Sequence, residues 1–93
     1  MTPAELLDRM EDLRDSRFSA SPTLQAIAAC ESGGNPTTDT GNGFYGKYQF
    51  DLPTWQAVGG SGNPAHASEA EQDRRATMLY ARAGAAPWPV CSR

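Results

Sequence analysis

The hexapeptide CESGGN, Cys30 to Asn35, places one carboxylate at the point where an apolar run ends. The preceding residues LQAIAA favour a helix, and Gly33 and Gly34 favour its end, so Glu31 is predicted in the last helical turn. The negative end of the helix dipole disfavours an ionised carboxylate, and partial burial acts in the same direction. Both effects predict a raised pKa for Glu31. A carboxylic acid of that kind can donate a proton at neutral pH, which makes Glu31 a candidate general acid.

A polar, glycine-rich segment, NPTTDTGNGFYGKYQF, follows Glu31 and combines neutral hydrogen-bonding groups with aromatic rings. This combination suits a sugar, whereas a phosphate would require cations or a helix N-terminus. The alternative is a purely structural loop, because Gly, Asn and Thr are also common turn residues. The candidate sugar-binding side chains in and beside this segment are Ser32, Asn35, Thr38, Thr40, Asn42, Tyr45, Tyr48 and Gln49.

Asp39 adds a second carboxylate eight residues after Glu31. It could contact the substrate, orient a water or stabilise a cation, but we favour an Asx turn that caps the TGNG loop. Asp51 and His66 are interpreted as structural, the first as a helix cap and the second as a loop residue. A nucleophile built from Cys30 and His66 is disfavoured, because Cys30 projects about 100° around the helix from Glu31.

Four helices are predicted to position these groups, at residues 3–18, 22–34, 52–58 and about 69–83. Ser21, Asp51 and Ser68 are the expected N-caps of the last three, and Glu71 is expected to complete a capping box with Ser68. A short hairpin is expected between Phe44 and Phe50. The expected fold class is α+β, mainly α. We divide the chain into an N-terminal amphipathic helix, residues 1–20, and a domain, residues 21–93.

The chain has 93 residues and a net charge of −3, which fits one small domain. Its Lys and Arg residues form no run, which argues against binding to nucleic acid or to an anionic membrane. No apolar run approaches the roughly 20 residues that span a bilayer. The start MTPAELLDRMEDLRD lacks the pattern of a secretion signal, so we expect a processed fragment, part of a longer protein, or export without its own signal.

The two cysteines, Cys30 and Cys91, are expected to form a disulfide that ties the C-terminal tail to the core. Such a bond would stabilise the fold by about 4 kcal/mol. Two free buried thiols are the alternative. A single histidine and the lack of a CxxC motif argue against a metal site, and no cofactor is expected.

Four segments, IAACESGGN, TGNGFYGKYQF, TWQAVGGSG and WPVC, occur in one collinear register that resembles the catalytic domain of the resuscitation-promoting factors. These are secreted actinobacterial proteins similar to lysozymes and lytic transglycosylases. The resemblance covers about residues 24–91 and implies a small lysozyme-like fold with a peptidoglycan groove. It implies that Glu31 is the catalytic acid and that Cys30 pairs with Cys91. By resemblance, Thr40, Tyr45 and Gln49 are expected to line the sugar groove, and Trp55 and Trp88 match aromatics near the core or groove floor. Trp55 is counted among the expected substrate-binding residues, and Asp39 and Asn42 are added from the polar loop.

The resemblance implies that Glu31 first protonates the bond between N-acetylmuramic acid (MurNAc) and N-acetylglucosamine (GlcNAc). The same residue then takes a proton from the muramic 6-hydroxyl, which closes a 1,6-anhydro ring; attack by water would instead give the product of a lysozyme-type hydrolase. Leu24, Pro36 and Ala85 occupy positions where tryptophan is expected, and the last two changes predict a shallower groove. Lys47, where glycine is frequent, is expected to meet the anionic wall polymer or to point to solvent.

Two other functions remain open from the sequence. The domain could bind glycan or serve a structural role without catalysis, since a fold alone does not establish activity. It could also be a phage lysin or virion component, with residues 3–18 docking on a protein partner or simply packing on the domain. The expected location is extracellular or at the cell wall, or on a virion.

Overall fold

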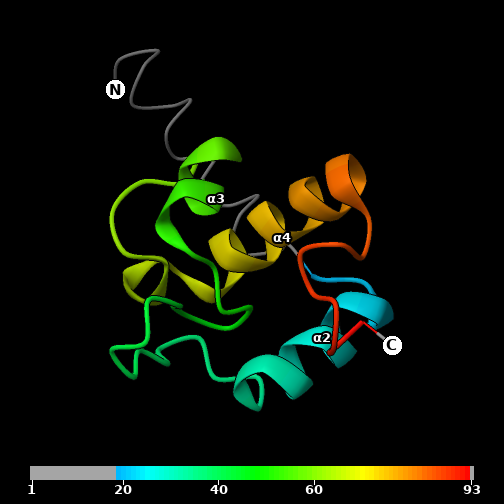
Figure 1. Cartoon of the computed structure of the whole chain (residues 1–93), viewed down its shortest axis with the longest axis horizontal. Helices are drawn as coiled ribbons and strands as arrows, with labels where there is room; N and C mark the ends of the chain where they lie inside the picture. The colour runs from blue at the N-terminus through cyan, green and yellow to red at the C-terminus, as the bar shows by residue number, and fades with distance from the viewer. Residues whose placement is uncertain (1–18, 93) are drawn as a thin grey trace, which may run out of the picture.

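The computed structural model describes residues 19–92, so the helix expected at residues 3–18 lies outside the described part of the chain. The elements follow in the order α2 (Pro22–Ser32), α3 (Leu52–Ala57), the short 3-10 helix η1 (Pro64–His66) and α4 (Glu69–Ala83). In Figure 1, α4 crosses the middle of the molecule with α3 on one side and α2 on the other. The C-terminal tail then returns from α4 to α2. The described chain is therefore mainly α, as the sequence indicates.

Short-range side-chain caps explain where the helices begin and end. The Ser21 hydroxyl accepts a hydrogen bond from the Leu24 amide, and Gly33 ends α2 in the left-handed conformation with φ of 68°. Asp51 caps α3 and Ser68 caps α4 in the same way. The three predicted N-caps are therefore confirmed. They could be predicted because each cap bonds to an amide only three residues away.

Two local predictions need correction. The capping box of α4 is only half formed, because the Glu71 carboxylate accepts a hydrogen bond from Arg75 Nε at 2.6 Å. The hairpin expected between Phe44 and Phe50 is reduced to isolated bridges, in which Tyr45 pairs with Phe50 and with Asp39. Left-handed turns at residues 46 and 49 reverse the chain too tightly for strands to extend.

The core lies where α2, α4 and the aromatic part of the loop meet. Trp55 and Trp88 are only 1% and 3% exposed, and both indole N–H groups donate to backbone carbonyls, of Ser61 and Tyr48 respectively. Because both polar N–H groups are satisfied, these large rings can be buried at little polar cost. The other buried hydrophobic residues in this cluster are Ala20, Leu24, Ile27, Ala28, Tyr48, Phe50, Val58, Ala76 and Leu79.

The expected disulfide between Cys30 and Cys91 is confirmed, and it joins residues 61 positions apart. It fastens the tail after α4 to the last turns of α2, as the course of the tail in Figure 1 shows. No helix in residues 19–92 is both long and apolar enough to cross a membrane.

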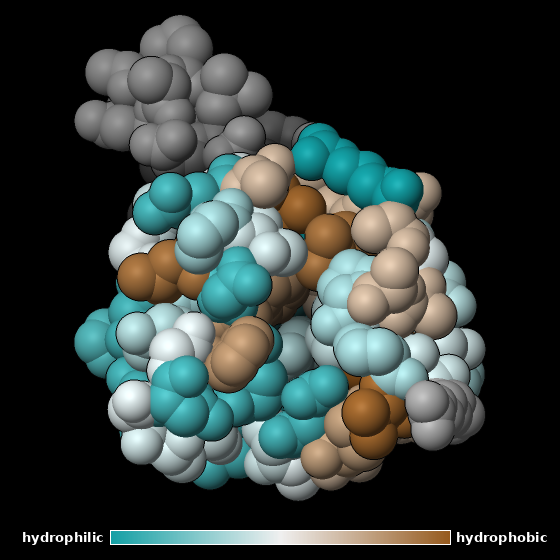
Figure 2. Space-filling model, in the orientation of Figure 1, coloured by the Kyte–Doolittle hydropathy of each residue, from teal (hydrophilic) through white to brown (hydrophobic). Residues whose placement is uncertain are grey.

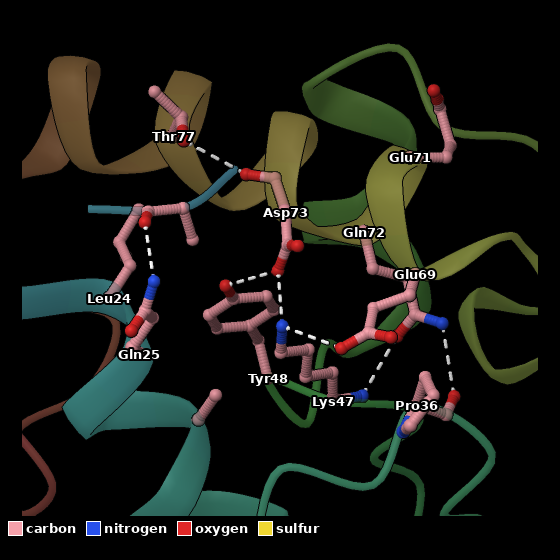
Figure 3. Close-up of polar contacts among 12 residues, drawn as sticks. Leu24, Gln25, Pro36, Lys47, Tyr48, Glu69, Glu71, Gln72, Asp73 and Thr77 are labelled. Carbon is pink, nitrogen blue, oxygen red and sulfur yellow. Dashed lines mark hydrogen bonds and ion pairs between the residues drawn. The ribbon is translucent and has the colours of Figure 1, made fainter. Parts of the chain in front are cut away.

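Lys47 does not point to solvent, so that expectation is wrong, and its ammonium is bound to two acids of this chain. It is 8% exposed, and its ammonium donates to Asp73 Oδ1 at 2.7 Å and to Glu69 Oε1 at 3.0 Å (Figure 3). Burial acts to lower the pKa of Lys47, but the hydrogen bonds and charges of Asp73 and Glu69 outweigh burial and raise it. The Tyr48 hydroxyl also donates to Asp73 Oδ1, at 2.6 Å. Lys47 therefore joins the loop to α4 as a buried cation.

Candidate functional site

Glu31 lies in the last turn of α2, one residue before the helix ends. Partial burial raises the pKa of its carboxyl. Within residues 19–92 this carboxyl makes no ion pair and accepts no hydrogen bond, in contrast to Asp73, which is paired with a cation. An unpaired, partly desolvated carboxyl at the negative end of a helix favours the protonated form that a general acid requires.

A depression of about 460 Å³ borders Glu31. One side of the depression comes from the polar loop and the other from the C-terminal tail. Figure 2 shows a hollow near the middle of the face of the molecule that it displays. No Lys or Arg lines it, so its polar groups other than Glu31 are neutral. The lining residues are Glu31, Asn42, Phe44, Gln49, Pro87, Trp88, Pro89, Val90 and Cys91.

A second depression of about 100 Å³ adjoins the first. The two share Phe44, Gln49, Pro87 and Trp88 as lining residues. The smaller one leads away from Glu31 toward the start of α3. Together they form a groove, which we call the Glu31 groove. Glu31 lines the larger depression and Asp51, the cap of α3, lines the smaller one, while the other lining residues are neutral or apolar. Mostly neutral and apolar walls of this kind suit a sugar chain.

Gln49 stands out in this groove because its backbone is left-handed, with φ of 54°, and it is the only non-glycine residue with positive φ among those described. A non-glycine residue in this region costs about 1–3 kcal/mol and is most often found at functional sites. Its side-chain Nε2 donates to the Gly46 carbonyl at 3.0 Å, which holds the amide in place. The strain therefore supports the expectation that Gln49 contacts the ligand.

The structure brings only some of the predicted substrate-binding residues together. Asn42 and Gln49 line the depression beside Glu31. Thr40, Tyr45 and Asp39 line neither depression of the Glu31 groove.

The carboxylate of Asp39 is engaged within its own loop. Its Oδ1 accepts from the Gly41 amide and its Oδ2 from Asn63 Nδ2, each at 3.3 Å. The Asx turn favoured from the sequence is confirmed, and Asp39 does not supply a second carboxylate next to Glu31.

Trp55 lines neither depression of the Glu31 groove, so of the two positions expected for it, core or groove floor, the structure shows the core. The ring is 1% exposed and packs against Phe50, with ring centroids 5.1 Å apart. It is buried because α3 carries it inward, so it supports the core rather than offering a face to a sugar.

Of the wall made by the C-terminal tail and Phe44, only Trp88 was expected near the groove from the sequence. Phe44 is 45% exposed and Val90 is 70% exposed, and both line the depression at Glu31. A signal for this wall was present: Cys91 pairs with the residue that precedes Glu31, so the residues just before Cys91 must lie near Glu31. Within residues 19–92, no three His, Cys, Asp or Glu side chains gather closely enough to hold a metal ion.

Comparison with known proteins adds independent information. A profile of the transglycosylase-like domain family matches residues 19–91. The chain is 52% identical over 71 residues to resuscitation-promoting factor Rpf of Micrococcus luteus, covering 76% of this chain and 32% of that protein. It is 53% identical over 73 residues to RpfE of Mycobacterium tuberculosis, covering 78% of this chain and 42% of the relative. It is 51% identical over 71 residues to RpfC of Mycobacterium tuberculosis strain Erdman, covering 76% of this chain and 51% of that protein. The chain therefore spans about a third to a half of these relatives.

Proposed function

The chain belongs to the transglycosylase-like domain family, with resuscitation-promoting factors as relatives, and on that basis we propose that it cleaves the glycan strands of peptidoglycan. The proposed target is the β-1,4 bond between MurNAc and GlcNAc, with Glu31 as the general acid. The observation that carries this proposal is the Glu31 carboxyl, which no residue among 19–92 pairs with and whose pKa is raised by burial, beside the depression of about 460 Å³.

Glu31 has two tasks in this mechanism. The protonated carboxyl donates to the leaving glycosidic oxygen, and the bond to the muramic anomeric carbon breaks. The carboxylate that results then accepts the proton of the muramic 6-hydroxyl, whose oxygen closes the 1,6-anhydro ring. The two steps return Glu31 to its protonated form, so the cycle needs no metal or other cofactor.

The arrangement of carboxylates favours this single-residue mechanism over a two-carboxylate hydrolase. Glu31 is the only Asp or Glu that lines the larger depression. Asp39 is engaged in its Asx turn, and Asp51 accepts from the Thr54 amide as the cap of α3. A lysozyme-type hydrolase uses a second carboxylate as nucleophile or to stabilise the cationic centre. We therefore favour the transglycosylase reaction, with hydrolysis as the second possibility.

Release of soluble fragments from purified actinobacterial cell walls tests the proposal. Glu31→Gln keeps the size and the hydrogen-bonding capacity of the side chain but removes the acid, so we expect wall clearing by the wild type and none by this variant. Glu69→Gln is the matched control, because that carboxylate lies outside the Glu31 groove on a side chain that is 57% exposed. Binding of wall fragments by the wild type without any cleavage would identify a non-catalytic glycan-binding module instead.

The remaining assignments are also proposals. Cleavage of peptidoglycan places the protein outside the cell, at the cell wall or on a virion. Residues 1–20 are proposed as a separate amphipathic segment, with residues 3–18 available to a protein partner, and residues 21–93 as the catalytic domain.

A further inference from the structure

Both sequence neighbours of Glu31 are tied to distant parts of the chain. Cys30 is joined to Cys91 by the disulfide. On the other side, the Ser32 hydroxyl donates to the backbone carbonyl of Lys47 at 2.6 Å, across 15 positions. Glu31 therefore lies between a disulfide and a hydrogen bond, although its own carboxyl bonds to no residue that the structure describes.

The Ser32 hydroxyl has a second possible acceptor, the Ala28 carbonyl in its own helix, at 3.3 Å. A hydroxyl has one proton, and O–H···O bonds in proteins most often measure about 2.7–2.8 Å. The bond to Lys47 is therefore the stronger one. A serine near a helix end usually bonds within its helix, whereas this one reaches out to another segment.

Lys47, whose carbonyl accepts the hydrogen bond of Ser32, is itself bound to α4 through its amide and its ammonium. The Lys47 amide donates to Gln72 Oε1 at 2.8 Å, and the Lys47 ammonium binds Asp73 and Glu69. Gln72 is fully buried, and its Nε2 also donates to the Pro36 carbonyl at 3.0 Å. Figure 3 shows these contacts converging on Lys47 from one face of α4. A chain of short contacts thus runs from α4 through Lys47 to the last turn of α2.

We propose that Ser32 is a positioning residue for Glu31: its bond to the Lys47 carbonyl holds the last turn of α2, and with it the Glu31 carboxyl, at the edge of the groove. Helix ends fray readily when nothing outside the helix holds them. A displacement of about 1 Å can cost about 100-fold in rate. This inference rests on the proposed role of Glu31 as general acid.

Initial rates on soluble peptidoglycan strands of the wild type, Ser32→Ala and Ser32→Thr test the inference. We expect Ser32→Ala to lower kcat by about ten-fold, within the range that small misplacements produce, while KM changes little. Ser32→Thr retains the hydroxyl and should restore most of the rate. The pH profile gives a separate signature: a loosened Glu31 is better solvated, so the alkaline limb should move to lower pH in Ser32→Ala. No other titratable side chain lines the larger depression, so this limb reports Glu31.

Thr77→Ala is the matched control. The Thr77 hydroxyl donates to the Asp73 carbonyl at 2.9 Å, so this variant also loses one hydroxyl-to-carbonyl bond, at an exposed site on α4 outside the Glu31 groove. We expect its kcat and pH profile to match the wild type. Equal losses of melting temperature and rate in Ser32→Ala and Thr77→Ala would overturn the positioning role.

Two further outcomes separate this inference from the proposed function. Full activity of Glu31→Gln would refute the proposed function itself. Inactive Glu31→Gln together with wild-type kcat and pH profile in Ser32→Ala would overturn only the role of Ser32. If Ser32→Ala is too unstable to assay, Ser32→Cys keeps a weaker donor and must show a kcat below those of the wild type and Ser32→Thr. A wild-type pH limb in that variant would equally overturn the inference.

Discussion

Asp73 and Glu69 both bind the Lys47 ammonium, but one is buried and the other is largely exposed. Removing each of them should therefore lower the free energy of unfolding by very different amounts. The Asp73 side chain is 8% exposed, whereas that of Glu69 is 57% exposed. Asp73→Ala leaves the Lys47 ammonium and the Tyr48 hydroxyl without their shared buried acceptor, which should cost about 3–5 kcal/mol in the free energy of unfolding. Glu69→Ala removes a partner that water can replace, at a cost of about 0–1 kcal/mol.

Urea denaturation of the wild type and both variants measures this difference at neutral pH. For a domain of this size each kcal/mol corresponds to about 4–8 °C in Tm, so thermal melts should separate the two variants clearly. The double variant Lys47→Met with Asp73→Leu replaces the buried pair by apolar groups and should recover much of the loss. Equal costs for Asp73→Ala and Glu69→Ala would refute the burial that we assign to Lys47.

Three other perturbations have definite expected outcomes. Replacing both Cys30 and Cys91 by Ser should lower the free energy of unfolding by about 4 kcal/mol in urea titrations, and a change below about 1 kcal/mol would contradict the role of the disulfide. Gly46→Ala should cost about 2–5 kcal/mol, because the new Cβ meets the buried Gln72 amide at a left-handed position, whereas Gly41→Ala, with nothing nearby, should cost about 1–2 kcal/mol; similar costs in thermal melts would count against the close packing at Gly46. Because burial raises the pKa of Glu31 in the folded state, the folded protein binds more protons and wild-type stability falls as pH rises through that pKa. Glu31→Gln should therefore be more stable than the wild type at pH 7, and the difference in free energy of unfolding should close below about pH 4.3. A variant less stable than the wild type at pH 7 would contradict the raised pKa.

Much of the fold could be predicted because its signals are local. Ser21, Asp51 and Ser68 cap helices through amides three residues away, and the glycine after Ser32 ends α2 as expected. The family resemblance drawn from four short segments is confirmed by the domain match over residues 19–91. Signals of this kind can be predicted from the sequence because each hydrogen bond forms within one helical turn and does not depend on distant residues.

Long-range burial could not be predicted. Lys47 lies in a polar, glycine-rich stretch that is typical of solvated loops, but its partners come from α4, 22 and 26 residues later. Trp55 illustrates the opposite case, since the resemblance left both the core and the groove floor open for it, and the ring packs in the core. A residue type alone does not determine whether its side chain faces a groove or the interior.

The candidate site was predicted in part for the same reason. Glu31, Asn42 and Gln49 come together because they lie at a helix end and in the loop that follows it. The opposite wall, Pro87 to Val90, comes from the far end of the chain, and it is held beside Glu31 by the disulfide and by the buried Trp88.

The central claim is that one carboxyl, that of Glu31, carries both proton transfers. Mass spectrometry of the fragments released from purified cell walls tests it most directly. We predict 1,6-anhydro-muramic ends, lighter by one water than the hydrolysis product, from the wild type and no fragments from Glu31→Gln. Reducing muramic ends from the wild type, or the same fragments from Glu31→Gln, would contradict this account.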